Sequence, residues 1–548
     1  MLRQGHAELM RYFVPYNRAQ SREALADAAS LLLARLLFIR SLEVRGLEQQ
    51  QIAPLLRGWQ RIGRRRDLLS LLTGVVRTLQ RLYGSPLLEP ALLDQLECEP
   101  TPIEPLIEAL LDPWIEQLLA DPLHLALGWE AAFAQPPRPW PGETARQLID
   151  LALPAAGKRD ELPAILDLSA AGGALLVLLA HHLRETCSKS TRRLSAAPDP
   201  IELLAALHGQ EADSGLRWGA YAALSLAILQ SRVRLPRLPT IGTEPSSSSY
   251  DVVLLYPPSP EKGCAVLNQA QSLIRTGGAL GMILPMEAAE APAWEPLRRS
   301  LFAAWSIATA QQLDGWLILV ARPEAHAERR AGSRIVINSG RRSAGTTIRQ
   351  GALAALPGTP LRLELTEAVE PILARVASGR PLTEVAMVRH IRPGAPAPEH
   401  GAQAIRAALP MILITPVQEP EGWRAIISNG WPADGGFTVQ PLALLAAHKG
   451  SGIRLTADKQ AELEPYTLEL LLALLRSRLL SLYRRLILGH SGPPTLDELR
   501  RLPIPHISSE RMRERAASVT ELAGGAHAER EIELLYGITM DKQTRRVA

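Results

Sequence analysis

The sequence has few cysteines and no long apolar run. Its three cysteines, Cys98, Cys187 and Cys264, are an odd number at wide spacing without a paired Cys or His pattern, which argues against a disulfide framework and a zinc site. The longest uncharged apolar stretch, Leu168 to Ala180, is shorter than the roughly 18 residues that a membrane span needs. Because the N-terminus is also polar, we expect no signal peptide, no membrane helix and a reducing, cytoplasmic setting.

Two functional signatures are also missing from the sequence. No glycine-rich loop is followed by Lys-Ser or Lys-Thr, so an ATPase is not supported, and no nuclease-like carboxylate cluster stands out. The composition, 47% hydrophobic and 21% charged over 548 residues, is that of a folded protein of about three or four domains. The formal net charge of +4 is too small to indicate a partner by itself.

The distribution of charge is more informative than its total. Nine arginines and four acidic residues lie between Leu471 and Arg515. This segment is a candidate phosphate-facing surface, in particular at Arg476, Arg478, Arg484 and Arg485, because DNA is bound largely through its backbone charges. A solvated helix face explains the same excess equally well.

Apolar periodicity divides the chain into regions. Spacings of three and four between Ser21 and about Leu47 predict an amphipathic helix, and Leu-rich stretches without strand alternation extend a helical domain over residues 1–135. Gln135 to Glu143 reads as a linker, and Thr186 to Pro200 and Pro245 to Ser249 as surface loops. Four short apolar runs between helical stretches then predict a doubly wound parallel sheet: Ala164–Leu166, Val252–Leu255, Leu280–Leu284 and Leu317–Val320.

Three motifs follow the expected strands of this sheet. In the first, a strand ends at Asp167, a turn of small residues follows, and a helix begins near Ala174. Small residues let backbone N–H groups approach a cofactor closely, and the helix N-terminus favours an anionic group. The same arrangement occurs in many α/β folds, so it predicts a binding site only together with the other motifs.

The second and third motifs place polar groups and a stiff loop at the same edge. Glu211 follows a short apolar stretch, where such folds bind ribose hydroxyls, although taken alone an acid at this place is more often a solvated residue at a helix start. The buried strand from Tyr250 runs into Tyr256-Pro257-Pro258-Ser259, whose prolines leave free carbonyl groups at the strand's end.

In this order, the three motifs resemble the DNA adenine-N6 methyltransferase family, in particular large restriction-modification members with a helical N-terminal domain and a C-terminal target-recognition domain. The resemblance covers nearly the whole chain. Leu31 to Leu47 is similar to the family's N-terminal helix, and Glu529 to Thr539 to its terminal helix. Arg380 to Gly394 resembles the opening of the recognition domain, and the stretch from Leu470 through Leu496 to Pro505 its close.

The resemblance implies a Rossmann-like core that binds S-adenosyl-L-methionine, with Asp167, Ala171, Gly173 and Glu211 at the cofactor positions. Ala171 stands where the family has its first glycine. A methyl group there weakens binding if the position needs a positive φ or touches the cofactor. The acid that contacts the adenine ring of the cofactor aligns with about Thr243, beside Glu244, and is lost.

The catalytic motif departs further from the family pattern, which is Asn, Asp or Ser, then Pro-Pro, then an aromatic residue. Tyr256 replaces the group that accepts hydrogen bonds from the target amine, and Ser259 replaces the aromatic ring that stacks on the flipped base. Pro257 and Pro258 are retained. The family is one of site-specific methyltransferases, but this motif leaves open whether the chain is an enzyme.

The sequence thus predicts an α/β protein with four parts: a helical domain (1–135), a Rossmann-like methyltransferase domain (144–330), a target-recognition-like domain (375–509) and a helical tail (510–548). We expect a pseudoenzyme that binds double-stranded DNA in restriction-modification or phage defence, together with other subunits and without a metal or a membrane. Two alternatives stay open: an active adenine-N6 DNA methyltransferase, and a methyltransferase-like module that acts on protein or RNA.

Overall fold

The chain is described by a computed structural model. It covers residues 1–548 except 65–66, 98–101, 135–138, 157–161, 190–199, 230–233, 235–240, 245–248, 340–345, 357, 417–422, 430, 433–434, 489–493, 523–524 and 540–548. The chain folds into two compact units. The N-terminal unit comprises Met1–Ser333 and Asn338–Ala344, and the C-terminal unit comprises Arg334–Ile337 and Gly345–Ala548.

The described residues before the linker are helical, as predicted. Seven α-helices and two short 3-10 helices are described before the linker: α1 (Leu2–Tyr16), α2 (Arg22–Val44), α3 (Ile52–Arg61), α4 (Leu68–Tyr83), η1 (Pro86–Leu88), η2 (Leu92–Gln95), α5 (Ile103–Leu110), α6 (Pro113–Leu119) and α7 (Pro122–Phe133). Helix α2 begins after Ser21, whose hydroxyl accepts the Ala24 N–H at 3.1 Å, so the predicted helix is capped where the sequence indicates.

Helix α2 is buried along almost its whole length, because other helices pack around it. Its two buried arginines are therefore neutralised inside the protein. Arg35 donates to Asp94 at 2.8 Å and to the Leu87 carbonyl, and Arg40 donates to Glu43 at 2.7 Å. Helices α2 and α7 also contact α11 (Ser214–Ile228), a helix that packs on the sheet described next. The helical region and that sheet therefore form one compact unit.

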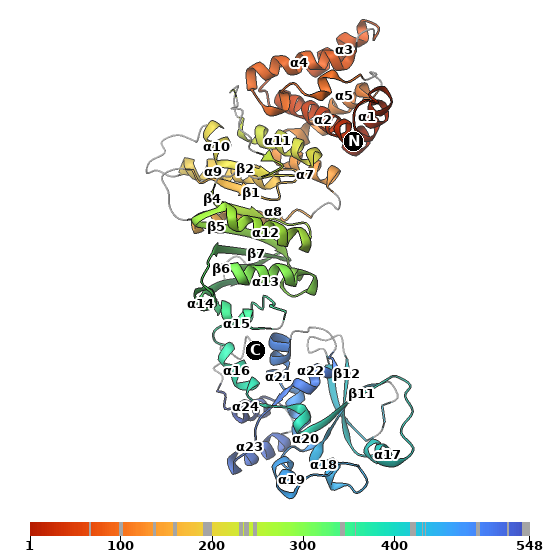
Figure 1. Ribbon diagram of the computed structural model, residues 1–548, viewed down its shortest axis with the longest axis vertical. Coiled ribbons are helices and arrows are strands. Elements are labelled where there is room, and N and C mark those ends of the chain that lie inside the picture. Colours follow the sequence, from red (N-terminus) through yellow and green to blue (C-terminus); the bar gives the residue numbers. More distant parts are fainter. Residues whose placement is uncertain are drawn as a thin grey trace. The chain divides into compact units, whose positions relative to one another are not determined.

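Seven strands of the large sheet lie within the N-terminal unit, in the order β3-β2-β1-β4-β5-β7-β6. Strands β1 to β5 pair with one another in parallel, β7 is antiparallel to β5, and β6 is antiparallel to β7. Their bounds are β1 (Ile165–Asp167), β2 (Leu207–Gln210), β3 (Ile241–Gly242), β4 (Tyr250–Leu255), β5 (Ile274–Pro285), β6 (Trp305–Leu313) and β7 (Trp316–Pro323). Figure 1 shows this sheet together with its helices.

Helices cover both faces of the sheet, as the buried central strands require. They are α8 (Gly142–Ala155), α9 (Ala174–Lys189), α10 (Pro200–Ala206), α11 (Ser214–Ile228), α12 (Pro260–Leu273), α13 (Glu295–Ala304) and α14 (Ala327–Gly332). Short 3-10 helices η3 (Met286–Ala289) and η4 (Pro292–Trp294) precede α13. The predicted fold class, an α/β protein with a Rossmann-like core, a helical N-terminal region and an α/β C-terminal domain, is confirmed by this architecture.

The C-terminal unit is built on an antiparallel sheet of four strands in the order β11-β14-β12-β13. A hairpin, β8–β9, and a short pair, β10–β15, complete its strands. The bounds are β8 (Arg334–Ser339), β9 (Thr346–Arg349), β10 (Arg380–Pro381), β11 (Ala386–Ile391), β12 (Met411–Pro416), β13 (Trp423–Ser428), β14 (Gly436–Pro441) and β15 (Pro503–Ile504).

Ten α-helices surround these strands in the described part of the unit. They are α15 (Gln350–Ala354), α16 (Glu370–Ala377), α17 (Gly401–Ala408), α18 (Leu442–Ala447), α19 (Ala457–Leu463), α20 (Leu468–Arg476), α21 (Arg478–Tyr483), α22 (Leu496–Arg501), α23 (Glu510–Glu521) and α24 (Ala526–Leu535). A 3-10 turn, η5 (Leu382–Glu384), precedes β11, and a π-helical turn, η6 (Arg484–Leu488), follows α21.

The two segments that resemble the opening and the close of a recognition domain pair with each other. Arg380 lies opposite Ile504, and Pro381 opposite Pro503. The side chain of Tyr466 reinforces this junction, because its hydroxyl donates to the Pro505 carbonyl at 2.8 Å. The expected tail, from residue 510, forms α23 and α24 and belongs to the same compact unit. The division into four parts remains a prediction.

Strand β6 is absent from the sequence-based prediction, although a signal for it exists. Asp314 and Gly315 join β6 to β7, and both have positive φ, 49° and 80°. An Asp-Gly pair between two apolar runs is typical of a two-residue hairpin turn. Most of the predicted loops 186–200 and 245–249, and residues 135–138 of the predicted linker, lie outside the described residues. No helix of the described chain is both long enough and apolar enough to cross a membrane.

Candidate cofactor and catalytic site

The turn after β1 is tight and enclosed. Asp167 is 1% exposed, and its carboxylate accepts the Ser169 N–H at 2.9 Å. The Gly173 N–H then donates to the Ala170 carbonyl at 2.7 Å, just before α9 begins at Ala174. The turn that the first motif predicts is therefore present, with the carboxylate organising its backbone.

The backbone of this turn enters the left-handed region twice, with φ of 44° at Ala171 and 85° at Gly173. A Cβ on Gly173 would lie 2.9 Å from the Ala220 Cα of α11. A Cβ on Gly172 would lie 2.4 Å from the Ala126 carbonyl oxygen of α7. Both glycines are therefore required by packing. Ala171 adopts the conformation of a glycine at a cost of about 1–2 kcal/mol.

Glu211 lies at the end of β2 and reaches this turn. One of its carboxylate oxygens accepts the Ala171 N–H at 2.9 Å, and the other accepts the Asp213 N–H at 2.9 Å. The four residues predicted at the cofactor positions, Asp167, Ala171, Gly173 and Glu211, thus lie together at the carboxyl ends of β1 and β2. That convergence could be inferred from the sequence because neighbouring parallel strands end at one edge.

Thr243 lies at this same edge of the sheet, whereas His208 lies near the start of β2, toward the opposite edge. Thr243 directly follows β3, where the family has an acid, and its carbonyl accepts a hydrogen bond from Gln210 at 3.3 Å. His208 on β2 packs edge-on against the Tyr250 ring, with centroids 5.2 Å apart. Burial lowers the pKa of His208, because a charged imidazole is disfavoured away from water.

Tyr256 follows β4, and its side chain is directed into the protein. The ring is 6% exposed and packs edge-on against Trp316, with centroids 5.7 Å apart and planes at 80°. Its hydroxyl donates to the Pro139 carbonyl. Its backbone N–H donates to the Ser169 hydroxyl at 2.7 Å, which joins the third motif to the first. The phenol is therefore held by the protein's own groups.

Ser259 caps helix α12. Its hydroxyl accepts the Lys262 N–H at 3.4 Å, its carbonyl accepts the Gly263 N–H at 2.9 Å, and Pro260 is the first helical residue. A Ser followed by Pro and an acid is a common helix start. The family motif has an aromatic residue at the position of Ser259. The sequence Ser259-Pro260-Glu261 is instead a helix-start pattern, and it predicts the capping role that the structure shows.

The backbone of the β1 turn, its enclosed glycines and the adjacent Glu211 carboxylate are the groups a nucleotide-like cofactor requires at this edge. Among them, the turn backbone and the Glu211 carboxylate are the groups that could hold S-adenosyl-L-methionine, with the acid toward its ribose, although both Glu211 oxygens already accept backbone N–H groups. Thr243 offers no carboxylate to its adenine ring. No group of three or more His, Cys, Asp or Glu residues within the described part of the chain could hold a metal ion.

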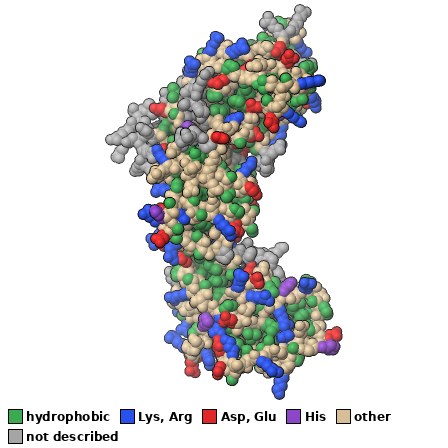
Figure 2. Space-filling view, in the orientation of Figure 1, with side chains coloured by type: hydrophobic (Ala, Val, Ile, Leu, Met, Phe, Trp, Pro, Cys, Tyr) green, Lys and Arg blue, Asp and Glu red, His purple; other side chains and the backbone are tan. Residues whose placement is uncertain are grey.

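The four predicted DNA-contacting arginines do not share one environment. Arg476, Arg478 and Arg485 are exposed. Arg484 is 3% exposed; it pairs with Glu498 at 3.3 Å, and its guanidinium carbon lies 4.8 Å from the Trp423 ring centroid. Arg484 does not fit the phosphate-facing role predicted for it, because its charge is satisfied inside the unit. Figure 2 shows Lys and Arg side chains interspersed with acidic ones on the surface.

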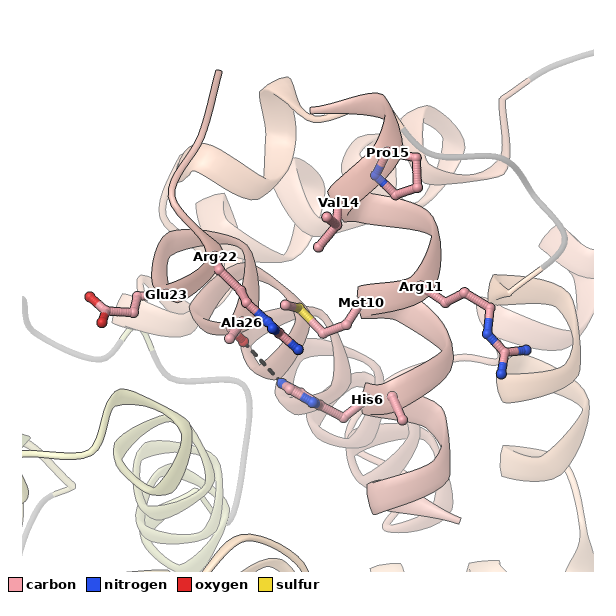
Figure 3. A pocket seen from close by; sticks show the side chains of 9 residues that line it. His6, Met10, Arg11, Val14, Pro15, Arg22, Glu23 and Ala26 are labelled. Atoms are coloured by element: carbon pink, nitrogen blue, oxygen red, sulfur yellow. Dashed lines mark hydrogen bonds between the residues drawn. The ribbon is translucent and has the colours of Figure 1, made fainter. Parts of the chain in front are cut away.

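Two cavities lie away from these motifs, among the N-terminal helices. The larger, of about 850 Å³, lies between α1 and the start of α2 and is lined by His6, Met10, Val14 and Arg22, among others. Figure 3 shows His6 and Met10 directed toward α2, where His6 contacts the Ala26 carbonyl at 3.2 Å. The second, of about 370 Å³, is apolar and lined in part by Trp114 and Leu118. Neither includes a predicted site residue.

Comparison with protein-family models and with curated proteins found no match. Solved structures show distant similarity. The type IIG restriction endonuclease BpuSI is 11% identical, over 94% of this chain and 75% of that chain, with a TM-score of 0.47. A type I restriction-modification methyltransferase subunit from Streptococcus thermophilus is 13% identical, over 62% and 86%, with a TM-score of 0.32. The DrdV–DNA complex is 10% identical, over 95% and 68%, with a TM-score of 0.40.

Proposed function

We propose that this chain is a DNA-binding protein on the scaffold of the adenine-N6 DNA methyltransferases, impaired in methyl transfer and acting in restriction-modification or phage defence. The observation that carries this proposal is the placement of Tyr256. Its phenol is buried, donates to the Pro139 carbonyl and packs on Trp316. A side chain held in this way is not available to accept hydrogen bonds from a target amine.

Ser259 supports the same conclusion from the other end of the motif. Base stacking on an aromatic ring contributes about 1–3 kcal/mol to binding a flipped base, and a serine has no ring to offer. Its hydroxyl is engaged as the cap of α12. Both side chains of the motif therefore have structural roles. Of its four residues, only Pro257 and Pro258 match the family pattern.

In this proposal the cofactor is S-adenosyl-L-methionine, bound weakly by Asp167, Ala171, Gly173 and Glu211. The cofactor would supply an electrophilic methyl group. The Glu211 carboxylate would accept from the ribose hydroxyls, although it also holds the Ala171 and Asp213 N–H groups. Ala171 places a methyl group at a left-handed turn position that favours glycine, which is the reason to expect weak binding.

The proposed partner is double-stranded DNA, with other subunits of a restriction or defence system as further partners. The exposed arginines Arg476, Arg478 and Arg485 are the candidate phosphate contacts from the basic segment. Their replacement by Gln in one variant should weaken binding to all sequences alike and lower the salt dependence by about one unit of slope per lost contact. Replacement of three exposed arginines of the N-terminal helices, Arg57, Arg77 and Arg81, by Gln is the matched control, because they lie outside the basic segment.

The decisive experiment measures methyl transfer and DNA binding side by side. The unmodified chain is incubated with labelled S-adenosylmethionine and mixed genomic DNA, and its DNA binding is followed by a gel shift. We expect a shift without incorporation of label. Robust incorporation would contradict the impaired-enzyme proposal and identify an active adenine-N6 methyltransferase, and absence of both signals would favour a module that acts on protein or RNA.

A rescue variant tests the stated cause of the defect. Tyr256→Asn with Ser259→Tyr restores the two family side chains, and Ala171→Gly should lower the cofactor concentration needed for half-maximal label transfer. Only partial rescue is expected. The buried pocket around Tyr256 is shaped for a phenol, and catalytic groups must be held to within about 0.5 Å.

A further inference from the structure

Two arginines of the C-terminal unit meet on one face of its four-stranded sheet. Arg389 on β11 lies opposite Thr438 on β14, and Gln440 is two residues along the same strand. Residues at this spacing point to the same face. The Gln440 amide donates to the Arg406 carbonyl at 2.7 Å and to the Leu409 carbonyl at 3.4 Å. The end of α17, which carries Arg406, is therefore fixed over the face that carries Arg389.

The two guanidinium groups are half-buried and repel one another. Burial, and then the charge of Arg406, lower the pKa of Arg389. Throughout the described residues, neither guanidinium has an ion pair with a carboxylate, in contrast to Arg35 with Asp94 and Arg484 with Glu498. The Arg406 Nε atom is enclosed by protein and has no acceptor. Charges removed from water are normally compensated, so two half-buried guanidinium groups without a carboxylate leave an uncompensated positive charge on this face.

A glycine-rich turn lies beside the pair. Lys449-Gly450-Ser451-Gly452 follows α18, and Gly450 and Gly452 have positive φ of 87° and 76°. A Cβ on Gly450 would lie 2.6 Å from the Ile405 Cδ1 of α17, and a Cβ on Gly452 would lie 3.9 Å from Arg406 Nη1. Turns of this kind bring backbone N–H groups near an anion, and Lys449 adds an exposed positive charge.

We propose that Arg389, Arg406 and the turn from Lys449 to Gly452 form an anion site whose ligand is a phosphate group of the DNA backbone. Two guanidinium forks match the oxygens of a phosphate, and an anion would supply the acceptors that both groups lack. The identification of the ligand as DNA rests on the proposed function. This anion site is separate in sequence from the basic segment of residues 471–515.

The test replaces each arginine in the full-length chain, as Arg389→Gln and Arg406→Gln, and measures affinity for a duplex across a series of salt concentrations. Each change should weaken binding by about tenfold and lower the salt slope by about one. Arg530→Gln is the matched control. It removes the same charge from an exposed position of α24, outside the basic segment, and should change affinity by less than about twofold.

The conservative variants Arg389→Lys and Arg406→Lys separate charge from geometry. They should keep most of the salt slope but lose affinity, because a lysine cannot form the two-pronged contact. Thermal unfolding of each variant establishes that it is folded. Wild-type affinity and salt slope in the folded Arg389→Gln, Arg406→Gln double variant would overturn the anion site and leave the proposed DNA binding intact.

Inorganic phosphate distinguishes a failure of the anion site from a failure of the proposed function. If the unmodified chain binds no duplex but phosphate raises its melting temperature, and Arg389→Gln abolishes that rise, the anion site stands with free phosphate as its source and the DNA proposal fails. If the unmodified chain responds neither to duplex nor to phosphate, both are wrong.

Discussion

The turn after β1 and the end of β4 lie side by side, but they differ in different ways from the motifs that they resemble. At the turn, Ala171 has the left-handed backbone that a glycine adopts easily. At the end of β4, two prolines follow Tyr256, and the hydroxyls of Tyr256 and Ser259 both have partners inside the protein. The difference at the turn is one methyl group on a backbone of unusual conformation, whereas the difference at β4 lies in side chains with structural contacts.

The comparison shows two kinds of packing constraint. The β1 turn is enclosed by α7 and α11, so Gly172 and Gly173 are needed for packing whether or not a cofactor binds. At the end of β4 the constraint falls on side chains, because Tyr256 is buried against Trp316 and Ser259 caps α12. Packing and capping therefore determine which residues are stable there.

The largest expected effect comes from truncating the buried phenol. Tyr256→Ala should lower the free energy of unfolding by about 3–5 kcal/mol, because it empties a filled site next to Trp316. Tyr256→Phe keeps the ring and loses only the hydrogen bond to Pro139, at a cost of about 1 kcal/mol. Urea unfolding followed by circular dichroism measures both. Equal stability of Tyr256→Ala and the unmodified chain would mean that the phenol lies in an open pocket.

The next largest effect should appear at the glycine that contacts α11. Gly173→Ala combines a positive φ with a contact 2.9 Å from the Ala220 Cα, and should cost about 2–3 kcal/mol. Gly128→Ala is the control, since a Cβ there meets nothing within 4 Å and α7 should gain about 0.5–1 kcal/mol. If Gly128→Ala also lowered the free energy of unfolding, the loss at Gly173 could not be assigned to its contact with α11, and the comparison of the β1 turn with the end of β4 would weaken.

A smaller effect is expected from removing the cap of α12. Ser259→Ala should cost about 1 kcal/mol, and Ser259→Asp should retain most of the stability because its carboxylate can accept the same N–H group. Ser272→Ala, at an exposed position of the same helix, is the control and should be almost neutral. A neutral Ser259→Ala would show that the serine does not stabilise the fold and would leave the loss of the aromatic residue without a structural reason.

The smallest expected effect on the free energy of unfolding concerns Ala171, and it tests the left-handed backbone of the β1 turn directly. Ala171→Gly should raise the free energy of unfolding by about 0.5 kcal/mol, since relief of the left-handed conformation exceeds the extra freedom of the unfolded chain. Ala170→Gly, at the preceding residue outside the left-handed region, should lower it by about 1 kcal/mol. Urea unfolding of each variant and of the unmodified chain measures these changes in the free energy of unfolding. Destabilisation by Ala171→Gly would argue that the turn is adapted to alanine.

Much of the sheet and the grouping of the first site could be predicted from the sequence. Short apolar runs identify the central strands β1, β4, β5 and β7, because these strands are buried on both faces. Asp167 and Glu211 each follow one of two neighbouring parallel strands, so their meeting at one edge follows from connectivity alone. Strand β6 is half-exposed at many positions and gives a weaker pattern.

The arginines mark the limit of sequence reasoning. A local count of charges selects Arg484, but tertiary packing buries it against Glu498 and Trp423. The same count passes over Arg389 and Arg406, which are 17 positions apart in the sequence and meet only because Gln440 ties α17 to the sheet. Whether a charge is paired depends on groups that are distant in sequence, so composition cannot decide it.

The sequence by itself determined the helical N-terminal region, the central strands β1, β4, β5 and β7, and the residues that stand at each motif. These properties are local, because apolar periodicity, proline and glycine act over a few residues. Only the tertiary structure decided what the altered residues do: the phenol of Tyr256 fills a buried site, Ser259 caps a helix, and Ala171 bears a glycine's backbone. The physical reason is that burial and hydrogen-bond partners come from segments such as Pro139 and Trp316, which chain folding alone brings beside residue 256.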